Sequence, residues 1–199
     1  MGVGNGTECL YGKWTSPGVI LKPSDELRID AYPDADFAGL WGYEDPHDST
    51  CVRSRTGFVI CVSDCPVMWV SKLQTEIATS TLEAEYVAMG TCCRSLFPMI
   101  RTVKAIAKGI GLSPREVTNM HVKLHEDNNG ALTLAKLPPP RMTPRTKWYA
   151  VKYHWFRSQL GPNKVELVKI DTKSQKGDFY TKGLRREPFQ HLRYLTQGW

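Results

Sequence analysis

The sequence lacks any long run of apolar residues. No stretch of its 199 residues approaches the roughly 20 apolar residues that a membrane-spanning helix needs. The charged segment and apolar core of a secretory signal peptide are also missing at the start of the chain. Internal repeats and low-complexity tracts are absent as well. We therefore expect a soluble, unexported protein, whose 41% hydrophobic content supports one compact domain with one core.

Cysteine is scarce, and its spacing fits neither a zinc site nor a disulfide framework. The six cysteines form no CxxC pair, and none lies near a histidine at zinc-ligand spacing. Cys61 and Cys65 flank a predicted turn, whereas Cys92 and Cys93 fall on a predicted helix. We interpret the cysteines as small buried side chains in a reducing compartment.

Acidic residues are outnumbered by basic ones. The chain has 26 Lys and Arg against 20 Asp and Glu, which gives a net charge of +6. Such a surplus favours a polyanionic partner such as nucleic acid. Charge alone does not identify this partner, because many basic proteins bind no nucleic acid.

Hydrophobic periodicity predicts a domain over residues 27–199, preceded by a connector over residues 1–26 that carries one short strand at 19–21. A strand over 27–34 is followed by a hairpin of strands 57–62 and 67–70. A long helix begins at Ser80, which forms a capping box with Glu83, and Pro98 should kink or end it before the helical pattern resumes to Gly109. The remaining predicted elements are a strand at 121–126, a helix at 129–136, an aromatic helix at 147–160, a strand at 165–170 and a helix at 177–195.

Three strands in hairpin order, followed by strand–helix–strand alternation, predict the α/β class. The expected architecture is a mixed five-stranded sheet with helices on both faces. Asp34 and Asp127 would then lie at the ends of neighbouring central strands. Helices would bring in Glu85 and Asp178.

Each of these four acids stands where a predicted element starts or ends. Carboxylate oxygens are the ligands that Mg²⁺ prefers, and two Mg²⁺ ions about 3.5–4 Å apart can activate a water and stabilise the leaving oxygen of a phosphodiester. The pattern therefore favours a two-metal nuclease. The alternative is that acids at helix starts act as caps, which is our interpretation for Glu83.

Five stretches of the chain resemble the ribonuclease H domain of copia-type (Pseudoviridae) retrotransposon polyproteins. They occur in the order expected for that family, and the resemblance runs from about Tyr11 to Trp199. The stretches are residues 32–39 (YPDADFAG), 53–59 with 69–74 (RSRTGFV and WVSKLQ), 80–88 (STLEAEYVA), 126–131 (EDNNGA) and 176–184 (KGDFYTKGL).

The resemblance implies a ribonuclease H-like fold and an endonuclease that cuts the RNA strand of RNA–DNA hybrids during reverse transcription. It implies two Mg²⁺ ions, for which Mn²⁺ can substitute. Asp34 would bridge both ions, Glu85 and Asp127 would hold the one nearer the leaving group, and Asp178 the one that carries the nucleophilic water. The reverse transcriptase part of the same polyprotein would be a partner, joined through residues 1–26, within a cytoplasmic virus-like particle.

Hybrid recognition requires contacts to 2′-hydroxyls in the wide minor groove and to phosphates. Backbone amides and short side chains beside the acids suit the first task, and a basic segment suits the second, although that segment could equally be a solvated loop. We interpret His121, His125 and the aromatic residues 148, 149, 153, 155 and 156 as packing or surface residues. The candidate nucleic-acid contacts are Ala35, Ser80, Thr81, Asn128, Asn129, Arg141, Arg145 and Lys147.

Several departures from the family pattern leave alternatives open. Trp148 stands where the family has histidine, Gly177 where it has alanine, and no histidine precedes Asp178. Asp36 follows Asp34 in an Asp-x-Asp arrangement, which is also typical of related exonucleases. The main rival hypothesis is a catalytically silent or domesticated nucleic-acid-binding or structural module, which would act in the nucleus if domesticated.

Overall fold

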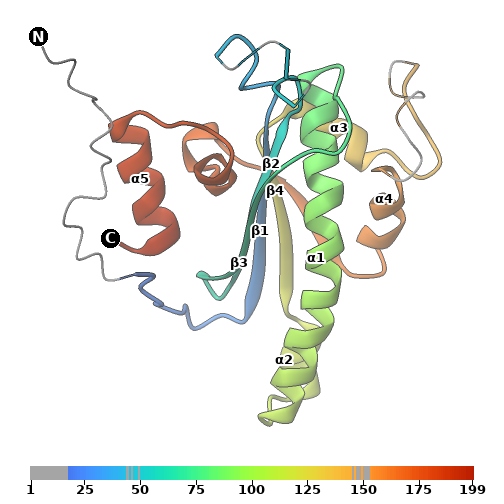
Figure 1. The fold of residues 1–199 in the computed structure, drawn as a ribbon. Coiled ribbons are helices and arrows are strands. Elements are labelled where there is room, and N and C mark those ends of the chain that lie inside the picture. The colour runs from blue at the N-terminus through green and yellow to red at the C-terminus, as the bar shows by residue number, and fades with distance from the viewer. Residues whose placement is uncertain are drawn as a thin grey trace, which may run out of the picture.

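The protein contains a five-stranded mixed sheet, seen in a computed structural model that describes residues 18–199 except positions 44, 46, 49, 145, 147, 148 and 150–152 (Figure 1). The strand order is β3-β2-β1-β4-β5. β1 and β3 run antiparallel to β2, whereas β4 is parallel to β1 and β5 is parallel to β4. This confirms the predicted sheet. The strands are β1 (Arg28–Asp36), β2 (Arg55–Val62), β3 (Cys65–Leu73), β4 (His121–Glu126) and β5 (Val165–Lys169).

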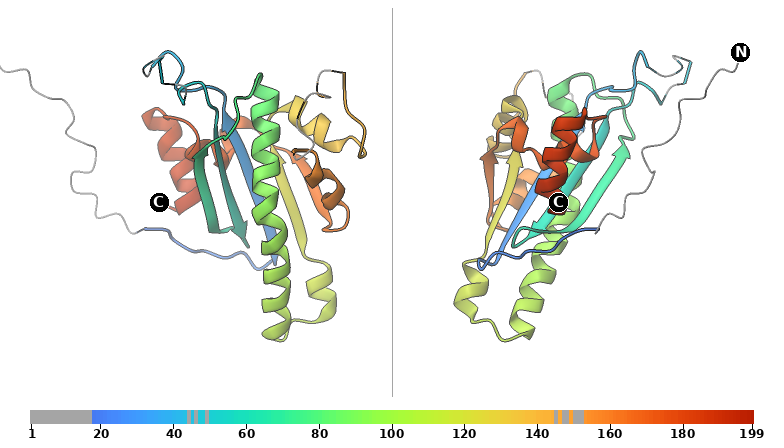
Figure 2. Two further views of the ribbon diagram at one scale, coloured as in Figure 1. Left: turned by 45° about the vertical axis from the view of Figure 1, so that its right-hand side comes forward. Right: turned by 90° about the vertical axis from the view of Figure 1, so that its left-hand side faces the viewer.

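The central strand β1 is buried on both faces. Ile29 and Ala31 face the main core, together with Leu124 of β4, while Tyr32 packs on the opposite face against Val59 of β2. A strand buried on both faces needs a covering layer on each. Helices supply both layers, as predicted (Figure 2).

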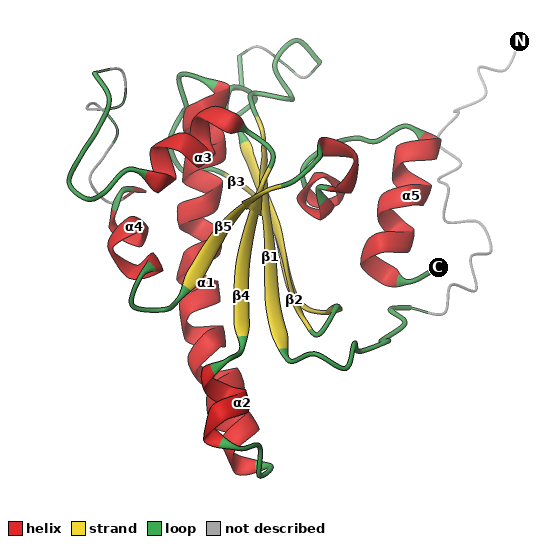
Figure 3. Ribbon diagram, turned by 180° about the vertical axis from the view of Figure 1, so that it is seen from behind, coloured by secondary structure: helices red, strands yellow, loops and turns green. Residues whose placement is uncertain are grey.

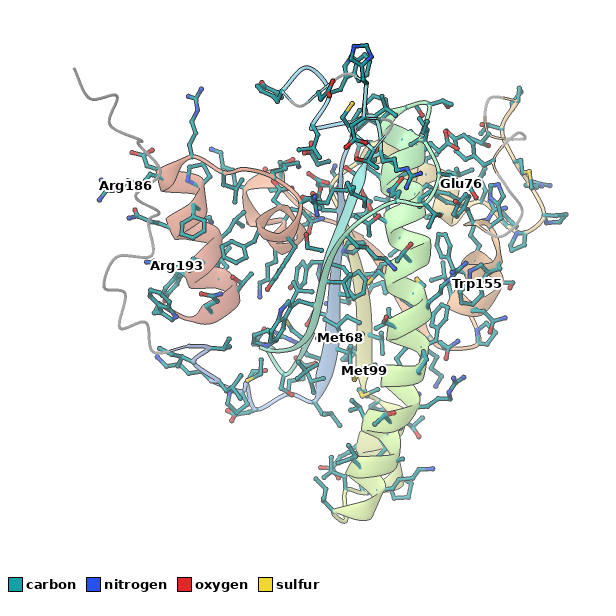
Figure 4. The ribbon with its side chains drawn as sticks, in the orientation of Figure 1. Met68, Glu76, Met99, Trp155, Arg186 and Arg193 are labelled. Atoms are coloured by element: carbon teal, nitrogen blue, oxygen red, sulfur yellow. The ribbon has the colours of Figure 1, made fainter. Side chains whose placement is uncertain are left out.

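The first layer contains α1 (Thr81–Gly109), α3 (Asn129–Lys136) and α4 (Trp155–Leu160). α1 lies along the sheet and extends beyond its lower end, where the short α2 (Pro114–Thr118) follows (Figure 1). Sequence periodicity missed α2, although Ser113 and Glu116 form a complete capping box at its start. The α4 side is tied to the segment before α1 by the Tyr153 hydroxyl, which donates to Glu76 Oε2 at 3.0 Å; Figure 4 labels Glu76 and Trp155 on this side.

The second layer contains the 3₁₀ helix η3 (Lys176–Tyr180) and α5 (Arg186–Gln197), on the opposite side of the sheet (Figure 3). A short 3₁₀ turn, η2 (Thr172–Ser174), precedes them. The prediction of one helix over 177–195 is therefore wrong. Pro188 provides the reason, because a proline fits best in the first turn of an α-helix, where no backbone N–H is needed for a helical hydrogen bond. α5 accordingly begins two residues before it, at Arg186.

α1 continues across Pro98 as one helix, so the predicted interruption does not end it. Phe97 and Ile100 are buried on either side of the proline, and their packing holds both halves of the helix on the core. The capping box at its start is only half formed. The Ser80 hydroxyl accepts from the Glu83 backbone N–H at 3.2 Å, but the Glu83 carboxylate accepts from Thr79 instead of returning to Ser80.

Two further expectations were wrong. α4 spans only Trp155–Leu160, and Tyr149 lies in a bend instead of a helix; positions 147 and 148 fall outside the described residues. Residues 18–26 contain no strand. The Ile20 backbone N–H instead donates to the Gln197 carbonyl at the end of α5, at 2.8 Å.

The five cysteines of the described chain are buried, in agreement with their interpretation as small packing residues. Within the same part of the chain, no helix is long and apolar enough to cross a membrane.

Candidate metal centre at the ends of β1 and β4

Three carboxylates meet at one edge of the sheet. Asp34 lies on β1, Glu85 on the second turn of α1, and Asp127 directly after β4. One oxygen of each lies within 4.8 Å of the others. β1 and β4 are parallel neighbours, so their carboxyl ends reach the same edge and bring residues 34 and 127 together. The predicted convergence of these three acids is thus present.

The environment of Glu85 shows how strongly this cluster concentrates negative charge. Glu85 is buried, and its Oε2 accepts from the Ala35 backbone N–H at 2.8 Å. Burial, followed by repulsion from Asp34, Glu126 and Asp127, raises the pKa of Glu85 to about 10. A cation placed among these groups would relieve the repulsion.

The donor set fits a hard divalent cation. Asp34, Glu85 and Asp127 offer carboxylate oxygens, the ligands that Mg²⁺ and Mn²⁺ favour. Asp34 is fully buried and Glu85 is nearly so, while Asp127 is half-buried and leaves the cluster open on one side. This combination leaves room for ligands from outside the protein, as Mg²⁺ sites that share a substrate phosphate require.

Asp178, the fourth predicted acid, is not part of this three-carboxylate group among the described residues. It lies on η3, where Lys182 Nζ is 2.6 Å from its Oδ1 and 3.4 Å from Asp34 Oδ1. The Thr181 hydroxyl donates to Asp34 Oδ2. Burial, followed by repulsion from Asp34, raises the pKa of Asp178 to about 7. Asp178 therefore reaches Asp34 from η3, and Lys182 contacts both carboxylates.

Two residues hold η3 against β1 at this point. The buried Gln175 side chain donates to the Pro33 carbonyl at 3.0 Å and accepts from the Gly177 N–H at 3.2 Å. A Cβ on Gly177 would lie 2.6 Å from Asp34 Cβ and 2.8 Å from the Tyr32 carbonyl oxygen. The glycine found in place of the family's alanine thus permits this close approach.

Sequence reasoning missed Glu126. This residue is fully buried, and its Oε1 accepts from the Asn128 N–H at 2.9 Å, which fixes the chain on the far side of Asp127. Burial raises the pKa of Glu126 well above its ordinary value. The sequence pattern could have shown that Glu126 is buried. Glu126 shares one strand face with Val122 and Leu124, both of which point into the core.

The candidate substrate contacts fall into three groups. Ala35, Ser80 and Asn128 already use their polar groups within the fold: the Ala35 N–H binds Glu85, Ser80 caps α1, and Asn128 Oδ1 accepts from the Ala131 N–H at 3.0 Å. Thr81 and Asn129, the first residues of α1 and α3, are exposed.

The third group is the basic segment. Arg141 is exposed, and its backbone carbonyl accepts from the buried Arg157 guanidinium at 2.9 Å. Arg145 and Lys147 lie outside the described residues. The structure therefore places only part of this segment.

The remaining side chains behave as packing or surface residues. His125 stacks on Tyr32 at 4.5 Å between ring centroids and lies 2.7 Å from Asp30 Oδ1. His121 is largely exposed beside Glu26. Tyr153 and Phe156 are buried, Trp155 packs edge-on against Phe97, and Tyr149 is partly buried against the core.

Asp36 ends β1 and lies two residues from Asp34 on the same strand face. Its carboxyl occupies the space that a Cβ on Gly39 would need. Burial raises the pKa of Asp36. It is not a member of the carboxylate group formed by Asp34, Glu85 and Asp127 among the described residues.

Comparison with known proteins identifies the relatives of this chain. It is 30% identical over 186 residues to the Retrovirus-related Pol polyprotein from transposon TNT 1-94 of Nicotiana tabacum, an alignment that covers 94% of the chain. It is also 30% and 29% identical over 175 residues to the Pol polyproteins from transposons RE2 and RE1 of Arabidopsis thaliana, each over 88% of the chain. The chain is homologous to the Pol polyproteins of copia-type retrotransposons.

The copia-type homology covers a short part of each relative. The alignments span 13% of the TNT 1-94 polyprotein and 11% of the RE1 and RE2 polyproteins, so the chain corresponds to about a tenth of their length. No protein-family model matches the chain.

Among solved structures, the chain is similar to LC11-RNase H1 in complex with an RNA/DNA hybrid, with a TM-score of 0.48 and 15% identity over 77% of this chain and 94% of the other. It is also similar to the N-terminal RNase H domain of rv2228c from Mycobacterium tuberculosis, with a TM-score of 0.47 and 10% identity over 84% and 96% of the two chains. The strand order and strand directions of this copia-type segment are those of a ribonuclease H-like fold.

Proposed function

We propose that this chain is a metal-dependent endonuclease that hydrolyses the RNA strand of RNA–DNA hybrids during reverse transcription of a retrotransposon. The observation that carries the proposal is the meeting of Asp34, Glu85 and Asp127 within 4.8 Å at one edge of the sheet. Homology to copia-type Pol polyproteins supports it. In this proposal, residues 1–26 connect the nuclease to the reverse transcriptase part of the polyprotein.

The proposed cofactor is Mg²⁺, with Mn²⁺ as a substitute and two ions per site. Asp34, Glu85 and Asp127 would hold the first ion, and Asp34 with Asp178 the second. When bound, Mg²⁺ lowers the pKa of a coordinated water and stabilises negative charge on the leaving oxygen. The protein's own part is to orient the ligands before metal arrives.

That orientation rests on bonds already described. The Ala35 N–H fixes one oxygen of Glu85, and the Thr181 hydroxyl fixes one oxygen of Asp34. Lys182 contacts both Asp178 and Asp34, and a second ion held by these two carboxylates would take the place of its ammonium. Pre-oriented ligands lower the cost of assembling the site during reaction.

Recognition of the hybrid would use short polar groups beside the carboxylates. Thr81 and Asn129 are exposed at the first turns of α1 and α3, the helices that carry or follow two of the three clustered acids. Such groups can bond 2′-hydroxyls in the wide minor groove of an A-like duplex. This requirement is what would restrict cutting to the RNA strand.

A labelled RNA–DNA duplex tests the proposal directly. We expect internal cuts in the RNA strand with Mg²⁺ or Mn²⁺, none with EDTA, and none in an all-DNA duplex. Cutting of the all-DNA duplex, or stepwise trimming from a 3′ end, would contradict the proposal and favour the exonuclease reading of Asp34 and Asp36. The Asp34→Asn variant serves as the control for contaminating nucleases.

One observation favours the second candidate, a silent nucleic-acid-binding module. The Lys182 ammonium already neutralises part of the charge on Asp34 and Asp178, as a resident cation would in a site that needs no metal. Hybrid binding without any cleavage across a wide range of Mg²⁺ and Mn²⁺ concentrations would support this candidate and refute the nuclease.

A further inference from the structure

A groove of about 710 Å³ opens beside the carboxylate cluster. One wall comes from the ends of β1, β2 and β3, and the opposite wall from η3 and the residues that follow it. Gly39, Leu40 and Tyr43, which follow β1, also line the groove. Asp36 and Lys182 line this groove, and Lys182 also touches Asp34 and Asp178. The groove is therefore continuous with the proposed catalytic site.

The lining of the groove carries an excess of positive charge. Arg53, Arg55 and Lys182 line it, and Asp36 is the single acid among the described lining residues. In the described part of the chain, neither arginine forms a salt bridge with a carboxylate. Arg55 is cross-strand from Asp36 and its Nη1 lies 3.5 Å from Ser71 Oγ, a long and weak contact. Arg55 attracts Asp36 and Arg53 attracts Asp48 only at longer range, so neither guanidinium is held by an ion pair among the described residues.

η3 packs closely on β2 beside this groove. Gly57 of β2 lies directly beneath η3, where a Cβ would be 2.6 Å from Thr181 Cγ2 and 2.8 Å from Tyr180 Cβ. β2 and η3 therefore approach as closely as backbones allow. Asp34, Asp36, Arg55 and Gly57 all belong to the strand face on which η3 packs, so the acids and Arg55 point to the same side of the sheet.

The chemistry of the lining points to a phosphate chain. A guanidinium fork pairs with phosphate through two parallel hydrogen bonds, which makes arginine the side chain best suited to this ligand. Tyr43 adds a ring that is 90% exposed at the same groove, where a base could stack. A polynucleotide strand combines both requirements.

We propose that this groove holds the phosphates that neighbour the scissile phosphate on the strand being cut, and that Arg53 and Arg55 each pair with one of them. The inference rests on the proposed function and adds a second substrate-binding region on the η3 side of the sheet. It assigns the phosphate contact to residues that differ from the basic segment 141–147. The cut strand is the occupant because the groove adjoins the carboxylates through Asp36 and Lys182.

Salt-dependent binding tests the assignment. Hybrid affinity is measured from about 50 to 200 mM salt in EDTA, with Asp34→Asn as the parent protein so that no substrate is cut. Adding Arg53→Gln and Arg55→Gln should weaken binding and flatten the log–log salt slope by about 1.8, since each lost phosphate contact removes about 0.9. Replacing both arginines by lysine should restore most of the slope, because the charge is kept.

A matched control uses two basic residues far from the groove. Arg101 and Lys108 are exposed on α1, about 24 and 35 Å along the helix from Glu85 at 1.5 Å per residue. Changing both to glutamine removes the same charge and should leave the slope almost unchanged. Equal flattening in this control would overturn the proposal by showing that net charge alone sets the slope.

Neutral methylphosphonates in the substrate identify the strand. Two of them placed beside the cleavage point on the RNA strand should weaken binding of the parent but add little to the loss in the double glutamine variant. If the methylphosphonates and the two glutamine substitutions weaken binding by independent amounts that add in full, the assignment of Arg53 and Arg55 to these phosphates is overturned. If the parent binds hybrid and the double variant keeps its full slope, the groove proposal fails while the nuclease proposal stands. If the parent binds no hybrid, both fail.

Discussion

The ammonium of Lys182 lies 2.6 Å from Asp178 Oδ1 and 3.4 Å from Asp34 Oδ1. Burial lowers the pKa of Lys182, but the two carboxylates raise it above its ordinary value, so the side chain stays charged at neutral pH. One partly exposed cation therefore links the acid on β1 to the acid on η3. Any metal ion that binds between these carboxylates must compete with it.

Replacing Lys182 by methionine should tighten metal binding. The substitution removes the competing charge and keeps much of the side-chain volume, so Mn²⁺ affinity should rise roughly tenfold, equivalent to about one pKa unit of interaction. Calorimetric titration of the metal-free protein measures this. Lys173→Met, at an exposed position on η2, is the control and should bind Mn²⁺ as the parent does. Unchanged or weaker binding in Lys182→Met would show that the ammonium does not compete.

Asp34→Asn and Asp127→Asn should each abolish most hybrid cleavage. Each change removes a proposed ligand charge at nearly constant volume, and the rate should fall by about 10²–10³-fold or more, the scale seen when one electrostatic stabiliser is lost. Single-turnover cleavage measures the rate, and circular dichroism checks the fold. Near-parental cleavage by either variant would remove that residue from the proposed site.

The metal-free protein should lose stability as pH rises. Glu85 and Asp178 have folded-state pKa values of about 10 and about 7, both above their ordinary values. Each group therefore holds its proton more tightly when folded, so its contribution is fully present below about pH 4 and is lost as pH rises through the folded pKa.

Glu85→Gln isolates this effect, because glutamine keeps an oxygen for the Ala35 N–H but cannot ionise. The difference in melting temperature between Glu85→Gln and the parent should grow in favour of the variant from pH 5 to pH 9. Saturating Mg²⁺ should raise the parent's melting temperature more at pH 9 than at pH 5. A pH-independent difference would mean that Glu85 is not destabilised by ionisation.

Gly57→Ala should destabilise the fold by about 1–3 kcal/mol, the usual cost of overpacking. The added Cβ would lie within 3.0 Å of Thr181 and of the Tyr180 backbone, which cannot move aside without shifting η3. Chemical denaturation measures the loss. Gly183→Ala is the control, since nothing lies within 4 Å of its added Cβ. Equal stability of the two variants would show that η3 is not packed tightly on β2.

The sheet and α3 could be predicted well from the sequence because their signals are local. Strand alternation located all five strands, and α3 spans Asn129–Lys136 as predicted, with Asn128 as its N-cap. The parallel pairing of β1 with β4 follows from strand–helix–strand alternation. Because parallel neighbours end at the same edge of the sheet, that alternation alone was enough to predict that Asp34 and Asp127 lie close together.

The failures involve contacts between distant residues. No local pattern shows that Lys182 will reach Asp34, because that contact depends on how η3 docks on β1. Packing on both sides of Pro98 overrides its tendency to end a helix. In contrast, the true start of α5 could have been predicted from the sequence, since Pro188 favours the first turn of a helix.

The parallel pairing of β1 with β4 also has a kinetic consequence. Asp34 and Asp127 are 93 positions apart in the chain (127 minus 34). Pairing between strands so far apart is slow, because the entropy cost of closing the loop comes before the stabilising contacts form. A chain in which only the β1–β2–β3 hairpins and α1 have formed can present Asp34 and Glu85 but lacks Asp127. The metal cluster is therefore completed only when β4 docks, so a partly folded chain cannot assemble the full set of ligands.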